Sequence, residues 1–227
     1  LAHLGIDPST CTASIQGFGK VGKHTAVAFV EMLGGKVMAI SSWDPCDHRA
    51  YTFCKKGGID PWFLETITDQ YGTIDKKKAI AAGYIVEEGD AWLAKDVDVL
   101  VPAATEGVIT GETVTRISPK VKVLAEGANG PTTSEADKVL EAKGVFVIPD
   151  FLCNAGGVIC SYFEGVQNNT NYYWGEEEIK NKLMHKMTSA FHKVLSIAEE
   201  RGVYMRQAAY LIAIQRVVEA MRWRGWI

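Results

Sequence analysis

Short apolar runs recur along the chain as far as residue 148, with helical or loop-like segments between them. Several are almost continuously apolar, which is typical of strands buried on both faces of a parallel sheet. The repeated order of strand, helix and strand predicts an α/β fold with a doubly wound, mainly parallel sheet. The runs are Thr12–Gln16, Lys36–Ile40, Tyr84–Val86, Val97–Val101, Val121–Ala125 and Val145–Ile148.

Two of the intervening segments carry clear helix signals. Val21–Leu33 is apolar almost all round, so its helix should be well covered. Thr132–Glu135 offers a capping box for a second helix, which we expect to continue through Lys143. The stretch from 43 to 83 is less regular. We interpret it as loops around a short helix near Asp60–Tyr71, with the basic run Lys76–Lys78 as a solvated face.

After residue 148 the pattern becomes helical, with apolar residues at every third or fourth position. One stripe runs from Ile179 to Ile197 and a second from Leu211 to Met221, each opposed by a polar row. We therefore expect one domain over residues 1–227, in which an α/β core at 1–150 precedes a helical segment at 151–227. The apolar stripes need a partner surface.

Composition narrows the functional classes. With 47% hydrophobic and 22% charged residues the chain is typical of globular proteins, and a net charge of −3 offers no attraction to nucleic acid or anionic membrane. No apolar run reaches the ~18 residues of a spanning helix. The five cysteines are odd in number and form no C-x-x-C, which favours reduced thiols in the cytoplasm. The scattered histidines predict no metal site.

A G-x-G-x-x-G run, made by Gly17, Gly19 and Gly22, lies between the first apolar run and the first helix. A strand that turns tightly into a helix presents unpaired N–H groups and a positive dipole end, which suit a diphosphate. The first glycine permits the turn, the second the approach of phosphate, and the third close packing of helix on strand. The placement favours dinucleotide binding over an ordinary glycine turn.

Three further loops begin at the carboxyl ends of predicted strands, where ligands bind in open α/β sheets. Pro102–Glu106 supplies small residues, and Ala125–Thr133 and Pro149–Glu164 each supply an asparagine within two residues of a glycine. Taken singly, the last two can be read as capping turns, because Asn and Gly favour turns for local reasons. Together with the glycine run they indicate a site.

Four motifs then carry a resemblance: IQGFGKVG (Ile15–Gly22), PAATEGVI (Pro102–Ile109), EGANGPTT (Glu126–Thr133) and NAGGVICSYFE (Asn154–Glu164). The chain resembles the Rossmann-like cofactor-binding domain of glutamate dehydrogenases, within the superfamily that acts on Glu, Leu, Phe and Val. The resemblance implies NAD(P)-linked oxidative deamination, foremost of L-glutamate to 2-oxoglutarate and ammonia. It also implies a small-molecule substrate and a homo-oligomer.

The resemblance also implies site residues. Those expected to bind the cofactor are Gly17, Phe18, Gly19, Lys20, Val21, Gly22, Ser41, Ser42, Ala104, Thr105, Asn129 and Asn154. Ser161 matches the serine that bonds a substrate carboxylate in the glutamate-specific branch. A buried hydroxyl facing an alkyl side chain would be stranded, so the match favours a polar substrate.

Two departures from the family pattern affect the choice of coenzyme. Lys20 stands where the family usually has Asn. Ser42 stands where the second strand normally ends in an acid that accepts a bond from the adenosine ribose. Without that carboxylate nothing repels a 2′-phosphate, and Ser41, Ser42 or Arg49 could bind one. The sequence thus favours NADP over NAD, unless Asp44 takes the acid's place.

In the family the proton transfers belong to a lysine and an aspartate of an N-terminal substrate domain, which no stretch of this chain resembles. We therefore assign no catalytic residue and expect the chain to be the cofactor half, inactive alone, with the substrate domain elsewhere. The alternatives are a non-catalytic nucleotide-binding or regulatory domain and a Leu, Phe or Val enzyme. An unrelated Rossmann oxidoreductase is disfavoured, because the chain has no Tyr-x-x-x-Lys.

Overall fold

The first apolar run becomes the centre of a seven-stranded sheet with the order β4-β3-β2-β1-β5-β6-β7. β1 pairs in parallel with both neighbours, β2 and β5, and β5 pairs in parallel with β6. Beyond β2 the sheet turns antiparallel through β3 and β4. The bounds are β1 Thr12–Gln16, β2 Lys36–Asp44, β3 Arg49–Cys54, β4 Ile85–Glu88, β5 Val99–Pro102, β6 Val123–Ala125 and β7 Phe146–Ile148. The predicted α/β class is confirmed.

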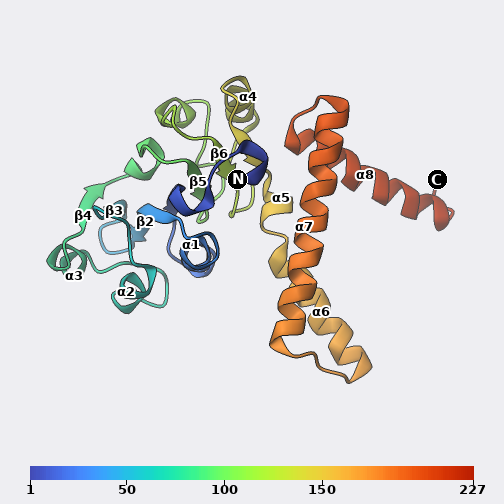
Figure 1. Ribbon diagram of the computed structural model, residues 1–227, viewed down its shortest axis with the longest axis horizontal. Helices are drawn as coiled ribbons and strands as arrows, with labels where there is room; N and C mark the ends of the chain where they lie inside the picture. The colour runs from blue at the N-terminus through green and yellow to red at the C-terminus, as the bar shows by residue number, and fades with distance from the viewer. The chain divides into compact units, whose positions relative to one another are not determined.

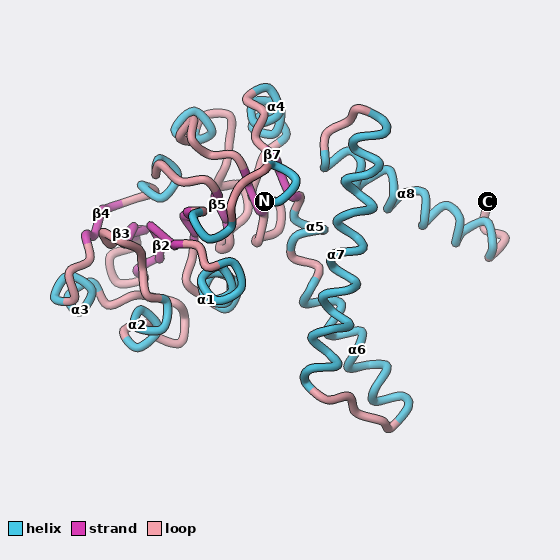
Figure 2. The backbone as a smooth tube through the Cα atoms, viewed as in Figure 1, coloured by secondary structure: helices cyan, strands magenta, loops and turns pink.

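The computed structural model describes all 227 residues, which divide into the units Leu1–Phe146 and Val147–Ile227. In the first unit, helices flank the strands (Figure 2). Its α-helices are α1 Lys20–Leu33, α2 Pro61–Thr66, α3 Lys76–Ala81 and α4 Ser134–Ala142. Short 3-10 helices cover Ala2–Leu4, Pro8–Thr10, Ala91–Ala94 and Thr113–Arg116.

Helices α1 and α4 form close to where their sequence signals placed them. α1 buries Ala26 and Phe29, and Gly34 ends it in the left-handed conformation that glycine adopts without strain. The cap of α4 is Thr133, whose hydroxyl accepts from the amide of Ala136. The cap thus lies one residue later than the capping box predicted. A reciprocal bond from this position is ruled out, because Ala136 has no polar side chain that could reach back to the cap.

The irregular stretch from 43 to 83 contains more structure than the sequence predicted. β2 continues to Asp44, β3 pairs with it in antiparallel register, and α3 begins at Lys76 with Asp75 as its cap. Lys76 is not a solvated residue, because its amine pairs with the carboxylates of Asp44 and Asp47. Only its neighbours Lys77 and Lys78 are exposed.

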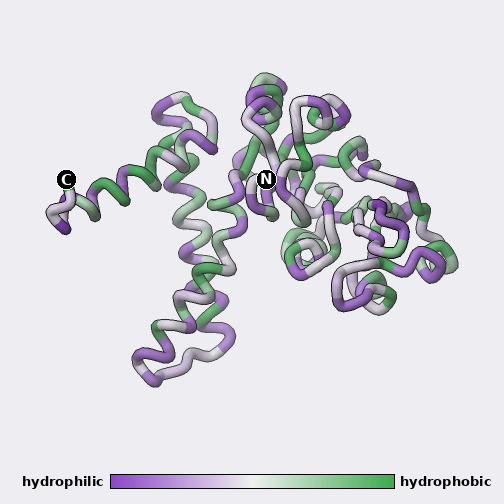
Figure 3. Tube along the Cα trace, turned by 180° about the vertical axis from the view of Figure 1, so that it is seen from behind, coloured by the Kyte–Doolittle hydropathy of each residue, from purple (hydrophilic) through white to green (hydrophobic).

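The second unit is helical after the end of β7. It contains α5 Asp150–Cys153, α6 Gly156–Thr170, α7 Glu176–Arg201 and α8 Met205–Trp223. α7 runs alongside α5 and α6 and contacts α8 at the following turn (Figure 1). The apolar stripe of α7 faces its neighbours, whereas Leu211 and Ile214 on the stripe of α8 are exposed. Apolar residues therefore continue along the open length of α8 (Figure 3).

Phe163 of α6 anchors the packing inside this unit. Its ring meets Trp174 edge-on at a centroid distance of 5.5 Å, and Lys182 of α7 lies 4.7 Å over the same indole. Arg206 of α8 pairs with Asp150 of α5 at 3.5 Å. None of the helices of the chain combines the length and hydropathy needed to cross a bilayer.

Candidate nucleotide-binding site

Main-chain hydrogen bonds tie together the carboxyl ends of four adjacent parallel strands. The amide of Gly17 donates to Ser41 O at 2.8 Å, which joins the end of β1 to β2. The amide of Ala103 donates to Gln16 O, and that of Gly127 to Pro102 O, each at 3.0 Å. Three of the loops singled out in the sequence, after β1, β5 and β6, therefore meet at one edge of the sheet.

The glycine turn after β1 leaves no room for side chains at two of its three positions. A Cβ on Gly22 would lie 2.0 Å from Gly17 O, and one on Gly17, where φ is 90°, would lie 2.8 Å from the Cβ of Ala104. At Gly19 nothing lies within 4 Å. Gly19 is also the N-cap of α1, and no side chain caps this helix. The first amides of α1 thus remain available for an anion.

A cavity of about 560 Å³ opens at this turn. It is lined by Gly17, Phe18, Gly19, Lys20, Val21, Trp43, Pro45, Tyr71, Gly72, Thr73, Ala103 and Ala104. Lys20 is the one charged residue among them, so the lining carries no acid that would oppose a phosphate. The glycine turn, the uncapped N-terminus of α1 and the amine of Lys20 together fit the diphosphate of a dinucleotide.

One wall of the cavity, the loop of residues 69–75, was not identified from the sequence. Gly72 of this loop packs against the glycine turn so closely that a Cβ on it would lie 2.8 Å from Gly19 N. The hydroxyl of Ser42 holds the loop in place, since it donates to Gly72 O at 2.9 Å and accepts from the amide of Ile74 at 3.2 Å. The Asp-x-x-Gly pattern at 69–72 predicts a turn, but it does not indicate that this turn packs against the glycine turn after β1.

Beside the cavity, Gln16 ends β1 with an unsatisfied group. Its side chain is 8% exposed, its Oε1 is buried without a hydrogen-bond partner, and its Nε2 lies 3.5 Å from the hydroxyl of Thr105. Buried polar atoms without partners are rare, so this acceptor suits a ligand that donates. Thr105 and Ala104 are exposed at the same strand end.

The predicted residues differ in how the structure places them. Gly17–Val21 and Ala104 line the cavity, and Asn129 is exposed in the loop that is bonded to Pro102 O through the amides of Gly127 and Ala128. Asn154, at the end of α5, and Ser161, on α6, belong to the second unit. Their assignment to the same site stays a prediction.

The groups proposed to bind a 2′-phosphate are engaged elsewhere. Ser41 and Ser42 are each 3% exposed, and the Ser42 hydroxyl serves the 69–75 loop. Arg49 pairs with Glu88 across β3 and β4. Asp44, the alternative acid, forms an ion pair with Lys76 at 2.7 Å, and the hydrogen bond from that amine lowers the pKa of the carboxyl.

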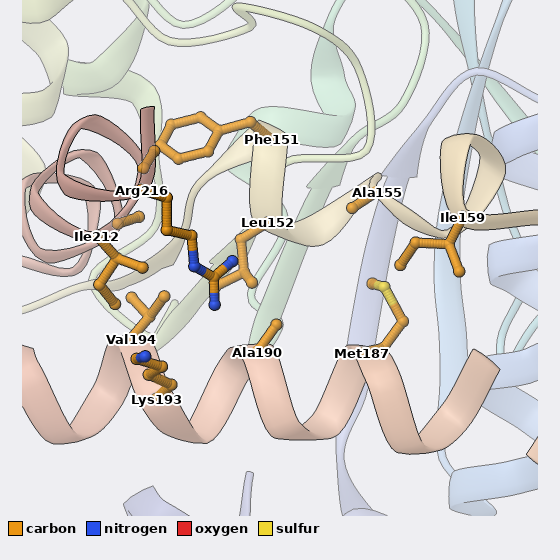
Figure 4. A pocket seen from close by; sticks show the side chains of 12 residues that line it. Phe151, Leu152, Ala155, Ile159, Met187, Ala190, Lys193, Val194, Ile212 and Arg216 are labelled. Atoms are coloured by element: carbon orange, nitrogen blue, oxygen red, sulfur yellow. The ribbon is translucent and has the colours of Figure 1, made fainter. Parts of the chain in front are cut away.

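A second cavity, of about 280 Å³, lies within the helical unit between α5, α7 and α8. Its lining is mainly aliphatic and includes Leu152, Met187 and Val194. Figure 4 shows Arg216 extending from α8 toward Leu152. With Arg216 and Lys193 as its charged residues and no glycine turn, this cavity has none of the features that fit a dinucleotide.

Comparison with known proteins places the chain among the amino-acid dehydrogenases. A family model described as Glutamate/Leucine/Phenylalanine/Valine dehydrogenase matches residues 1–225. The NAD-specific glutamate dehydrogenase of Clostridioides difficile is 42% identical over 225 residues, which are 99% of this chain and 52% of that protein. The glutamate dehydrogenase of Thermotoga maritima is 41% identical over 225 residues, 98% of this chain and 50% of that protein.

Solved structures agree with these matches. The crystal structure of glutamate dehydrogenase from Peptoniphilus asaccharolyticus aligns with a TM-score of 0.79 at 38% identity, covering 100% of this chain and 50% of that one. The hetero-hexameric glutamate dehydrogenase of Thermus thermophilus, in a Leu-bound form, aligns with a TM-score of 0.85 at 26% identity and covers 99% and 50%. The chain thus spans about half the length of these relatives, and it belongs to the glutamate/leucine/phenylalanine/valine dehydrogenase family.

Proposed function

We propose that this chain is the coenzyme-binding half of a glutamate dehydrogenase. The observation that carries the proposal is the uncapped glycine turn, which opens on an acid-free cavity where the ends of β1, β5 and β6 meet. Gly17–Gly22 would hold the diphosphate, and Ala104, Thr105, Asn129 and Asn154 would line the nicotinamide-ribose end. When bound, the nicotinamide supplies the acceptor for the hydride that leaves the amino acid.

For the coenzyme we propose NAD(H) and give up the preference for NADP. That preference depended on Ser41, Ser42 and Arg49, whose groups are buried or paired within the chain. Two relatives of 42% and 41% identity, from Clostridioides difficile and Peptoniphilus asaccharolyticus, are named NAD-specific. Binding of NADP would remove water from its 2′-phosphate at this end of the site, and none of these three side chains would be free to donate a hydrogen bond in its place.

For the substrate we propose L-glutamate, because Ser161, exposed on α6, matches the serine of the glutamate-specific branch and its hydroxyl can donate to a carboxylate. The missing catalytic lysine and aspartate are expected on a substrate domain, so the whole enzyme is proposed to need that domain. We also propose that the whole enzyme is an oligomer, since one structural neighbour is a hetero-hexamer; that its subunits are identical rests on the family resemblance alone. All five cysteines are free, which favours a reducing compartment such as the cytoplasm.

Calorimetric titration of the chain with NADH and NADPH tests the coenzyme proposal. We expect saturable NADH binding, NADPH binding at least about tenfold weaker, and no NADH production from NAD and L-glutamate without added substrate domain. Failure of both nucleotides to saturate at millimolar levels would contradict the coenzyme-binding function. Turnover by the chain alone would instead contradict the division of labour between two halves.

A further inference from the structure

Two exposed aromatic residues line the cavity from different elements. Trp43, near the end of β2, is 57% exposed, and Tyr71, in the 69–75 loop, is 80% exposed. Large aromatic side chains left in water at the rim of a cavity are typical of ligand contacts, because their burial is deferred until the ligand binds. Neither residue belongs to the family motifs of the sequence.

The backbone that carries Tyr71 is held from several sides. The carboxylate of Asp69 accepts from the amides of Tyr71 and Thr73, each at 2.9 Å, and Thr68 pairs with Ile74 as an isolated bridge. Ser42 closes the loop onto β2 through its hydroxyl. The main chain at Tyr71 is therefore fixed next to the glycine turn, while its ring remains free to receive a planar group.

The same region has no free carboxylate for a ribose. The residue aligned with the family acid is Ser42, and its hydroxyl is used within the protein. Asp44 is not among the lining residues, and Lys76 binds its carboxylate at 2.7 Å. Recognition of the adenosine end must therefore use other groups, and the two aromatic rings are the large side chains that remain.

We propose that the adenine ring of the coenzyme stacks on Trp43 and Tyr71, so that stacking takes the place of a carboxylate–ribose bond. The inference rests on the proposed coenzyme function and adds how the adenosine end is selected. Ser42 is a positioning residue, because it acts through the loop that bears Tyr71. Aromatic rings bind any nucleobase face but do not read the 2′ position, so the 2′-hydroxyl should matter little.

Titration with ADP-ribose, which keeps the adenosine, the diphosphate and the second ribose but lacks nicotinamide, tests this end of the site without the nicotinamide contacts. We expect Trp43→Ala and Tyr71→Ala each to weaken ADP-ribose binding about tenfold, and Trp43→Phe and Tyr71→Phe to keep most of the affinity. Trp62, 45% exposed on α2 and outside the cavity lining, provides the matched control, and Trp62→Ala should bind like the unmodified chain. ADP-ribose with a 2′-deoxyadenosine should bind within about threefold of the parent ligand.

The outcomes separate the two proposals. If the unmodified chain binds ADP-ribose and both alanine variants bind it equally well, stacking is wrong and coenzyme binding stands. A loss of affinity on removal of the 2′-hydroxyl that matches or exceeds the loss in the alanine variants would overturn stacking as well. If the unmodified chain binds neither NADH nor ADP-ribose, both proposals fail. Urea unfolding of each variant identifies any loss of affinity caused by misfolding.

Discussion

Gly22 and Gly19 lie in the same turn but are required for different reasons. Gly22→Ala would place a Cβ 2.0 Å from a carbonyl oxygen of the backbone, so we expect a loss of about 3 kcal/mol or more in the free energy of unfolding. Gly19→Ala meets no atom within 4 Å and should cost less than about 1 kcal/mol. Urea unfolding measures both values.

Gly19→Ala, which should change stability little, should have a large effect on coenzyme binding. Gly19→Ala puts a methyl group where a phosphate would approach, so NADH affinity should fall at least about tenfold although the chain remains folded. Unchanged NADH binding by this variant would show that the turn is structural only.

Ser42 provides a second prediction at this scale. Ser42→Ala leaves the amide of Ile74 and the carbonyl of Gly72 without their partner, which should lower the free energy of unfolding by about 1–2 kcal/mol. ADP-ribose affinity should also fall. The double variant with Tyr71→Ala should bind no more weakly than Tyr71→Ala alone, because both act through one ring. Additive losses would contradict a positioning role.

The glycine turn and Ser42 show what a sequence can and cannot reveal about single residues. The turn was predictable because its three glycines, the strand before it and the helix after it are all local. Ser42 was read as a 2′-phosphate ligand because its partners, Gly72 and Ile74, lie about thirty residues away in an unremarked loop. The same holds for Arg49, whose partner Glu88 comes from another strand.

At the scale of elements, an ion cluster joins the start of α3 to the end of β2. The amine of Lys76 contacts Asp44 and Asp47, and it also lies 4.1 Å over the ring of Tyr51. The hydrogen bond from Lys76 lowers the pKa of both carboxyls, and the two acids raise the pKa of the amine. The cluster is therefore fully charged at neutral pH.

The cluster predicts acid sensitivity of the first unit. A carboxyl whose pKa is lower in the folded than in the unfolded chain stabilises the fold above its unfolded value of about 3.9, and this stabilisation is lost as the pH falls through the folded pKa. The urea midpoint should therefore drop as the pH falls below about 4 and through the lowered pKa of the folded chain, and less so in Asp44→Asn, which keeps Oδ1 for the amide of Cys46.

Glu141→Gln, at an exposed position on α4, is the control for this effect and should follow the unmodified chain. If the urea midpoint of Asp44→Asn changes with pH as that of the unmodified chain does, the ion cluster contributes nothing measurable to stability, as is common for exposed pairs.

The elements missed by the sequence reading share a physical cause. β3 has two fully buried residues and gains its order from pairing with β2 and β4, so it has little pattern of its own. α3 is six residues long, too short to show a helical period, and its capping by Asp75 was the one local signal. Longer elements were predictable, α1 from a long run that is apolar almost all round and α7 from a periodicity that extends over several turns.

At the scale of the whole molecule, the apolar stripe of α8 shows that an apolar sequence pattern does not by itself determine which residues are buried. The sequence predicted a stripe that needs a partner, and two of its residues, Leu211 and Ile214, are 41% and 58% exposed. In α8 the buried residues are instead Met205, Ala208 and Ala209, at its first two turns. Periodicity identifies the face of a helix that is apolar, but the surface that covers it depends on parts of a protein that periodicity does not describe.

Asn154 is the one predicted coenzyme-binding residue outside the first unit, so a variant at this position tests its assignment most directly. Asn154→Ala and Asn129→Ala should each weaken NADH binding about tenfold, because each removes one hydrogen-bonding amide from the nicotinamide-ribose end. ADP binding should change in neither variant, since that ligand lacks both the nicotinamide and its ribose. Asn169→Ala, an exposed amide on α6, is the matched control. If Asn154→Ala binds NADH like the control while Asn129→Ala does not, the site is confined to the first unit, and the resemblance that assigned Asn154 to the coenzyme fails at that residue.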